Sequence, residues 1–219
     1  MTIAEDATLE EIRAALAPLI AANAAFDGWG ADARDFAADQ AGVDRDIARL
    51  AFEGGTFAMI DAWFASVDAA MRRALPAETL AGMKIRARIQ GLVEARLAVL
   101  HPHRDALRRA LALLALPPNT PRALALGWRT ADAMWRAAGD TATDYNHYTK
   151  RAILAAVYAA TITVFLDDES EDYAETRGFL ARRIEGIMRF EKAKAGFVER
   201  SQNLPSLSRF IGRLRYPAI

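Results

Sequence analysis

Two short stretches carry residue types that suit metal chemistry. His101, Pro102 and His103 bring two imidazoles together, but the proline favours a helix start, and no further histidine or cysteine lies nearby to complete a zinc site. Residues 167–172 are rich in carboxylates, yet they lack the glycine and the spacing of a calcium-binding EF-hand loop. We therefore expect the histidines in a loop before a helix, and the carboxylates to favour the N-terminus of the helix that follows them.

Asp144 and His147 are spaced for acid–base chemistry, with the carboxylate as the base and the imidazole as the acid. Such catalysis requires a cleft in which both groups converge, and no sequence pattern indicates one. Asp144 stands where a helix is expected to begin, and capping that helix is the ordinary role of such a residue. The protein is therefore predicted to be non-enzymatic, and no cofactor is expected.

The composition allows a sizeable core and excludes disulfides and thiolate metal sites. Its 219 residues are 53% hydrophobic, which allows a sizeable core, and it has no cysteine for disulfides or thiolate sites. The N-terminus has no basic segment or long apolar run, so a secretory signal is not expected and the predicted location is cytoplasmic. The longest uncharged run, residues 152–166, is shorter than the roughly 18 to 20 residues that span a bilayer, which predicts a buried helix.

The two ends of the chain differ in charge although the formal net charge is zero. Residues 1–53 hold eleven acidic side chains and four arginines, a net charge of −7. Residues 173–219 hold four glutamates and ten lysines or arginines, a net charge of +6. An anionic partner should therefore prefer the C-terminal end.

Apolar residues recur at three- and four-residue spacing along the chain, and no stretch alternates as a strand does, so the predicted fold class is all-α. Thr8 and Glu11 have the spacing of a capping box, which predicts a helix that starts at Thr8 and ends before Gly28. Thr56 is expected to cap a longer helix that runs to about residue 75. Later proline, glycine and acidic turns bring the total to about ten helices.

Residues 32–52 are arranged like a helix-turn-helix, with short helices predicted over residues 31–41 and 44–52. The turn is expected at Gly42, and the residues spaced to form the core of the motif are Val43, Ile47 and Leu50. Aspartates occupy the helix that would enter DNA, whereas phosphate contacts dominate DNA affinity. We therefore expect no nucleic-acid partner and interpret the motif as a retained scaffold.

Residues 135–140 and 143–151 read WRAAGD and TDYNHYTKR, and residues 116–119 read LPPN. This pattern resembles the signature of the ubiquinone-biosynthesis accessory lipid-binding family, including its Leu-Pro-x-Asn loop. The resemblance continues through residues 154–158 and 179–180, and it covers roughly residues 91–188 with high specificity.

This resemblance implies a tetracycline-repressor-like helical bundle without transcriptional function. It also implies a hydrophobic site for polyprenyl lipids and a partnership with the di-iron hydroxylase that modifies the quinone ring. The positions that match the family's partner-contacting patch are Met134, Asp144, His147 and Tyr148. Animal members carry Trp-Tyr where this chain has His147 and Tyr148, and an exposed tryptophan is a common interface anchor.

A lipid site needs a roomy apolar cavity without buried unpaired charge, and small side chains leave such space. The predicted lining residues are Leu97, Leu100, Leu111, Leu114, Trp135, Ile153, Ala156, Val157 and Thr161. Taken alone, an alanine- and leucine-rich stretch is more typical of a close-packed core. The family resemblance is what favours the pocket, with a bound isoprenoid or phospholipid in it.

The last residues predict a basic amphipathic helix that lies on a membrane surface. Its apolar stripe comprises Leu207, Phe210, Ile211 and Leu214. Its basic residues are Arg209, Arg213 and Arg215. The alternative for this stripe is packing against its own domain or against a second copy.

The predicted organisation is a vestigial helix-turn-helix over residues 1–55, a helical lipid-binding domain over residues 56–200 and a membrane-docking helix over residues 201–219. Repressor-like folds commonly pair through their last long helices, so residues 177–197 are the expected homodimer face. The predicted function is to present a polyprenyl quinone precursor to the hydroxylase at the inner face of the inner membrane. The alternative function is that of a ligand-responsive transcriptional regulator of the tetracycline-repressor type.

Overall fold

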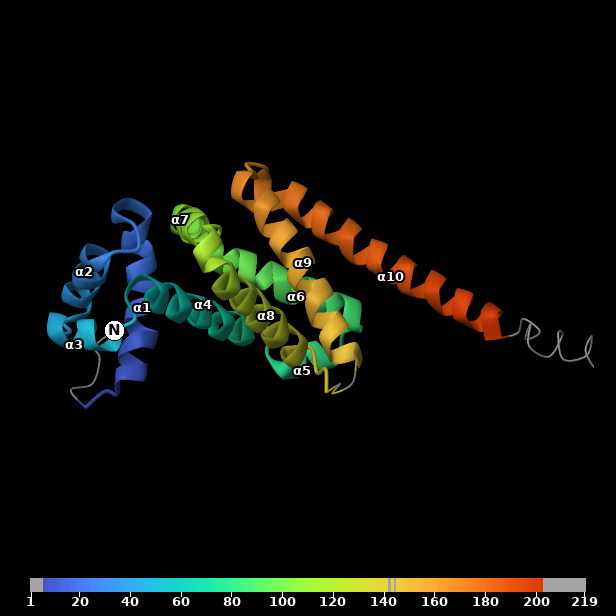
Figure 1. Ribbon diagram of the computed structural model, residues 1–219, viewed down its shortest axis with the longest axis horizontal. Coiled ribbons are helices and arrows are strands. Elements are labelled where there is room, and N and C mark those ends of the chain that lie inside the picture. The colour runs from blue at the N-terminus through green and yellow to red at the C-terminus, as the bar shows by residue number, and fades with distance from the viewer. Residues whose placement is uncertain (1–5, 142, 144, 203–219) are drawn as a thin grey trace, which may run out of the picture. The chain divides into compact units, whose positions relative to one another are not determined.

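The computed structural model describes residues 6–141, 143 and 145–202, and this part of the chain is helical without a strand. It contains ten α-helices, which confirms the all-α prediction (Figure 1). The α-helices are α1 (Leu9–Asp27), α2 (Ala31–Ala41), α3 (Arg45–Ala51), α4 (Gly55–Ala74), α5 (Ala77–Ala81), α6 (Ile85–Leu100), α7 (Arg104–Leu114), α8 (Thr120–Ala137), α9 (Tyr145–Asp167) and α10 (Ala174–Gln202). Three short 3₁₀ helices, η1 (His101–His103), η2 (Pro117–Asn119) and η3 (Glu171–Tyr173), lie between them. As predicted, the histidine pair directly precedes a helix, but it forms the 3₁₀ helix η1 and not a loop.

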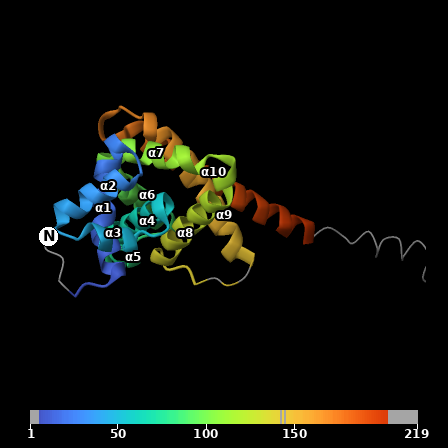
Figure 2. The same cartoon turned by 60° about the vertical axis from the view of Figure 1, so that its left-hand side comes forward.

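The chain forms two compact units, Met1–Leu180 and Ala181–Ile219. The first unit holds α1 to α9 and the beginning of α10. Within it, α1, α2 and α3 gather at one end, and α4 leads from them towards α6, α8 and α9 (Figures 1 and 2). The predicted domain boundaries after residues 55 and 200 remain predictions.

Helix α1 begins and ends where the sequence predicts. The Thr8 hydroxyl accepts a hydrogen bond from the Glu11 backbone N–H at 3.3 Å, and the Glu11 carboxylate accepts one from the Thr8 N–H at 2.8 Å. This reciprocal pair satisfies two N–H groups that a helix start leaves free. Gly28 follows the last turn with a φ of 77°, a conformation that glycine adopts without steric cost.

The prediction that Thr56 caps α4 is wrong. The N-cap is Gly54, no side chain caps this helix, and Thr56 lies within its first turn. The Thr56 hydroxyl instead donates to the Trp29 carbonyl at 2.7 Å. The buried Trp29 packs on Trp63 of α4, with 5.2 Å between ring centroids, so this hydroxyl helps to attach α4 to the start of α2.

The helix-turn-helix elements are present, but two of the three predicted core residues, Ile47 and Leu50, are exposed. Gly42 ends α2 with a φ of 68°, as a tight turn requires. In α3 the buried residues are Ala48 and Ala51, whereas Ile47 and Leu50 are 44% and 55% exposed. Helical spacing shows which residues share a face of a helix but not which face is buried. In α3 the face with the alanines packs inward.

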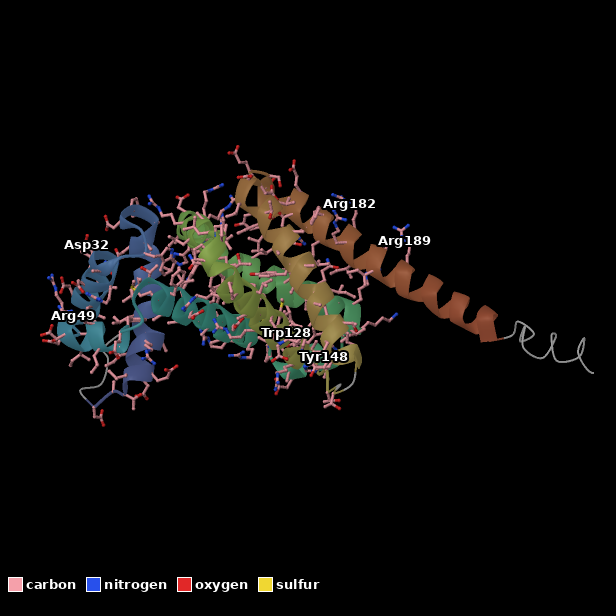
Figure 3. The ribbon with its side chains drawn as sticks, in the orientation of Figure 1. Asp32, Arg49, Trp128, Tyr148, Arg182 and Arg189 are labelled. Carbon is pink, nitrogen blue, oxygen red and sulfur yellow. The ribbon has the colours of Figure 1, made fainter. Side chains whose placement is uncertain are left out.

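The charges of α3 are paired with neighbouring carboxylates. Arg45 lies 2.5 Å from Asp39, and Arg49 lies 2.9 Å from Asp46. Arg49 and the acidic Asp32 are labelled on this end of the unit in Figure 3. The carboxylates beside these arginines oppose the approach of phosphate, which favours the interpretation of this motif as scaffold.

A buried ion pair joins α4, α6 and α9 in the core. Arg96 is completely buried, its Nη1 contacts the carboxylate of Asp68, and its Nε donates to the Tyr158 hydroxyl at 3.1 Å. The guanidinium also lies over the Tyr158 ring, 5.2 Å from its centroid. The three residues come from distant parts of the sequence, so this contact fixes how the helices pack.

The acidic turn between α9 and α10 is organised by one buried carboxylate. Asp168 is 3% exposed and accepts four hydrogen bonds, from the backbone N–H and the hydroxyl of both Ser170 and Thr176. Burial alone would raise the pKa of Asp168, but these hydrogen bonds outweigh it and lower the pKa from 3.8 to about 2. One of the predicted turn carboxylates therefore supports the first turn of α10.

Acid should remove this stabilisation. Because the pKa of Asp168 is lower in the folded protein than in the unfolded chain, its contribution is complete above about pH 4 and is lost as the pH falls through 2. We expect Asp168 to contribute about 1 to 2 kcal/mol of the stability lost over this interval. Urea unfolding between pH 5 and pH 2 checks the prediction: Asp168→Asn should flatten the pH dependence, and an unchanged slope would contradict it.

Candidate functional site

The signature motifs fold into a hairpin of α8 and α9 that a charge network holds together. Arg151 is 1% exposed, and it lies 2.6 Å from Asp132 of α8 and 3.1 Å from Asp140 of the connecting loop. Lys150 lies 2.8 Å from Asp140, and Arg151 also donates to the carbonyl of His147 at 3.1 Å. Burial opposes ionisation of both aspartates, but the hydrogen bonds from their cationic partners prevail and lower each pKa.

Other motif residues contribute to this hairpin and to its connection with α7. Trp135 is partly exposed, and its Nε1 donates to the Lys150 carbonyl at 3.0 Å while the Lys150 ammonium lies 5.4 Å from its ring centroid. Asn119 of the LPPN loop donates to the Leu113 carbonyl at 2.8 Å, which satisfies the C-terminal end of α7. Much of the sequence signature therefore serves to build this hairpin.

An aromatic surface lies on the hairpin and comprises Trp128, His147 and Tyr148. Trp128 and Tyr148 are labelled in Figure 3. The ring centroid of Tyr148 lies 5.1 Å from that of His147 and 6.0 Å from that of Trp128. Tyr148 is 62% exposed, which confirms that it lies on the surface beside His147. Sequence reasoning missed Trp128, although a tryptophan one heptad before Trp135 was a visible signal.

The other two partner-contacting candidates do not join this surface. Met134 is fully buried, so its prediction as a surface contact is corrected: this face of α8 packs into the core. Asp144 lies outside the described residues, and its predicted capping role stays a prediction.

The nine predicted lipid-binding residues differ in burial, and their role in lipid binding stays a prediction. Buried in the core are Leu97, Leu100, Leu114 and Thr161. Partly exposed are Leu111, Trp135 and Val157, whereas Ile153 and Ala156 are exposed on α9. Because protein interiors are close-packed, the four buried residues would have to rearrange to contact a ligand.

The prediction of a buried helix over residues 152–166 holds for only one face of α9. Its residues Leu154, Tyr158, Ile162 and Phe165 are buried, whereas the opposite face is exposed. Residues His147–Asp167 are long and apolar enough to cross a membrane by length and composition, yet only 39% of the most apolar window is buried. Within the described residues, α9 therefore exposes an apolar face.

A polar cavity of about 430 Å³ lies near the C-terminal end of α9. His101, Arg104, Asp105 and Glu169 contribute to its lining, and Arg104 donates to carbonyls at the end of α9. None of the nine predicted lipid-binding residues lines it. Its mixed charges do not suit a polyprenyl chain.

The predicted membrane-binding residues, 207–215, lie outside the described residues. The predicted homodimer face over residues 177–197 belongs to α10, which continues to Gln202. Arg189 on this helix lies 3.4 Å from Glu185 (Figure 3). Membrane binding and dimer formation both remain predictions.

This arrangement of helices is a tetracycline-repressor-like fold. The crystal structure of the TetR transcriptional regulator from Nitrosomonas europaea matches 80% of this chain and 97% of that chain, with a TM-score of 0.64 and 24% identity. At this identity the likeness shows the fold alone. Residues 120–191, which form α8, α9 and much of α10, match the model of the COQ9 family, so the resemblance to the ubiquinone-biosynthesis family is confirmed over this segment.

Curated relatives agree with this match. The human mitochondrial ubiquinone biosynthesis protein COQ9 is 43% identical over 100 residues, which cover 46% of this chain and 31% of the human protein. The Drosophila melanogaster protein of the same name is 28% identical over 192 residues, which cover 86% of this chain and 59% of the fly protein. This chain thus matches from about a third to three fifths of the length of these relatives, whose names place them in mitochondria. The cytoplasmic location predicted for this chain stays a prediction.

Proposed function

We propose that this protein is a non-enzymatic accessory factor of ubiquinone biosynthesis that binds an isoprenoid lipid and presents it to a di-iron hydroxylase. One observation carries the proposal: the segment that matches the COQ9 family folds into a hairpin whose outer face is apolar yet exposed. Polyprenyl quinone precursors are too insoluble to reach a peripheral enzyme unaided. A protein that holds such a lipid beside the enzyme raises its effective concentration there.

The exposed face of α9 is the proposed lipid contact. Ile153 and Ala156 lie on it, with the partly exposed Val157 beside them. Contiguous exposed apolar surface commonly marks a lipid, ligand or protein contact, because its hydration is unfavourable. Leu97, Leu100, Leu114 and Thr161 are buried and belong to the core.

Two further contacts complete the proposal. The aromatic surface lies at the start of the same helix, so a hydroxylase bound there would be close to a lipid on α9. The basic amphipathic stretch with Phe210 is the proposed membrane contact, because apolar residues on one side and arginines on the other suit an anionic bilayer surface.

Replacing Ala156 by tryptophan tests the lipid proposal. Ala156 is exposed, so a large side chain there should leave the fold intact while it obstructs the apolar face. We expect the purified wild-type protein to carry an isoprenoid or to accept one from vesicles, and Ala156→Trp to reduce the occupancy at least about fivefold. Organic extraction followed by mass spectrometry measures the bound lipid, and circular dichroism verifies the helical content.

Phe26→Trp provides the matched control, because Phe26 is 83% exposed on α1. This control should retain the wild-type occupancy. If Ala156→Trp leaves the lipid unchanged but converts a dimer into a monomer, the face is a contact between copies and the lipid proposal is wrong.

A further inference from the structure

We propose that the outward face of α3 docks a basic amphipathic helix of a protein partner. This surface, the α3 face, consists of the exposed side chains of Ile47 and Leu50 together with the neighbouring carboxylates of Asp46 and Glu53. The proposed function concerns the α8–α9 hairpin and the C-terminal residues and gives α3 no role. The contact at α3 is therefore an additional one.

Two large apolar side chains form the centre of the α3 face. Ile47 and Leu50 are 44% and 55% exposed, and their spacing of three residues places them on the same side of the helix. The opposite side of α3 is buried through Ala48 and Ala51, so the helix is firmly packed and still presents these two residues to solvent. Apolar residues at this spacing are the anchors with which one helix packs on another.

Hydrogen bonds fix α3 at both of its ends. At its start, Arg45 donates two hydrogen bonds to the carboxylate of Asp39 on α2, at 2.9 and 2.5 Å. At its end, the carbonyl of Ala51 accepts a hydrogen bond from the Nε of Arg13 on α1. A surface that is already ordered loses little conformational entropy when a partner binds, which favours α3 as a docking site.

The charges around the α3 face select a basic partner. Residues 31–53, which comprise α2, the turn and α3, hold six carboxylates and three arginines, a net charge of −3. All three arginines lie within 2.9 Å of a carboxylate of the same segment. Asp32, labelled in Figure 3, and Glu53 are exposed and form no ion pair within the described residues. A partner that carries lysines or arginines would therefore meet carboxylates that have no cationic partner of their own.

The same charges disfavour the other occupants of such a surface. The second helix of a helix-turn-helix is the one that enters DNA, but phosphates would meet the net negative charge of this segment. An anionic bilayer is disfavoured for the same reason. A symmetric contact with a second copy would bring two identical acidic segments together. A basic amphipathic helix matches both the apolar centre and the acidic surroundings, as in the apolar core and polar rim of a protein interface.

The test titrates the full chain into a fluorescently labelled, designed helical peptide of leucine and arginine, with the leucines along one side, and follows the anisotropy. We expect saturable binding to the wild-type chain. Ile47→Asp should raise the Kd at least about tenfold, because it removes an apolar contact although it adds a negative charge that attracts the peptide. Asp32→Asn with Glu53→Gln should raise the Kd about threefold at low salt, and this difference should vanish at high salt.

Ile85→Asp is the matched control, because Ile85 of α6 has the same 44% exposure as Ile47 and the variant gains the same charge. It should keep the Kd within about twofold of wild type, and circular dichroism should show wild-type helical content in every variant.

The proposal fails if the wild-type chain does not bind the peptide, or if Ile47→Asp and Ile85→Asp bind it equally well. Binding of duplex DNA that Ile47→Asp abolishes would make the α3 face a nucleic-acid contact and overturn the assignment. Self-association of the full chain that Ile47→Asp abolishes would assign the face to a second copy, which also overturns it.

Discussion

Replacing Asp68 by alanine should lower the free energy of unfolding by about 3 to 5 kcal/mol, the cost typical of breaking a buried ion pair. The reason is Arg96, which is completely buried and would keep its charge without its carboxylate partner. The Tyr158 hydroxyl alone cannot balance that charge, and one terminal nitrogen of Arg96 already has no hydrogen-bond partner. Urea denaturation followed by circular dichroism measures the loss.

The double variant Asp68→Leu with Arg96→Met tests whether the loss of stability comes from the unpaired charge of Arg96. Because both charges are replaced by apolar groups of similar size, most of the lost stability should return. If Asp68→Ala alone costs less than about 1 kcal/mol, Arg96 has another source of solvation, and the ion pair does not organise this core.

Replacing Arg151 by leucine should lower the free energy of unfolding by about 3 kcal/mol and, under the proposed function, should also weaken hydroxylase binding. Arg151 binds Asp132 and Asp140 from the buried side of the hairpin. Without it, each carboxylate loses one of its two cationic partners. It also releases the carbonyl of His147, which positions the aromatic surface. We therefore expect the melting temperature and the hydroxylase affinity to fall together.

Arg151→Lys is the matched variant. Lysine keeps the charge but cannot direct several planar N–H groups at separate acceptors, so it should recover only part of both losses. If affinity falls in Arg151→Leu while Arg151→Lys restores stability fully and affinity not at all, Arg151 would contact the partner itself. Its 1% exposure argues against that outcome.

Local rules determined the helices of this protein from the sequence. The capping box at Thr8, the glycine after α1 and the turn at Gly42 depend on residues a few positions apart, and each is found where it was predicted. The missed cap at Thr56 shows the limit of this reasoning. Its hydroxyl had a tertiary partner, the Trp29 carbonyl, that lies 27 residues away.

The family signature could be recognised from the sequence because it consists largely of residues that hold α8 against α9. Trp135, Asp140 and Arg151 make contacts between the two helices over short sequence distances. Such contacts are specified within a single hairpin, so a sequence pattern can identify the hairpin without knowledge of the rest of the fold.

Which face of each helix is covered was decided by the tertiary structure alone. Met134 was expected at the surface and is buried, whereas Ile47, Leu50 and Ile153 were expected in apolar surroundings and are exposed. Periodicity specifies the faces of a helix, but burial depends on which neighbours arrive, and those neighbours come from distant residues. Trp128 reaches Tyr148 for the same reason: α8 and α9 must pack before the aromatic surface exists.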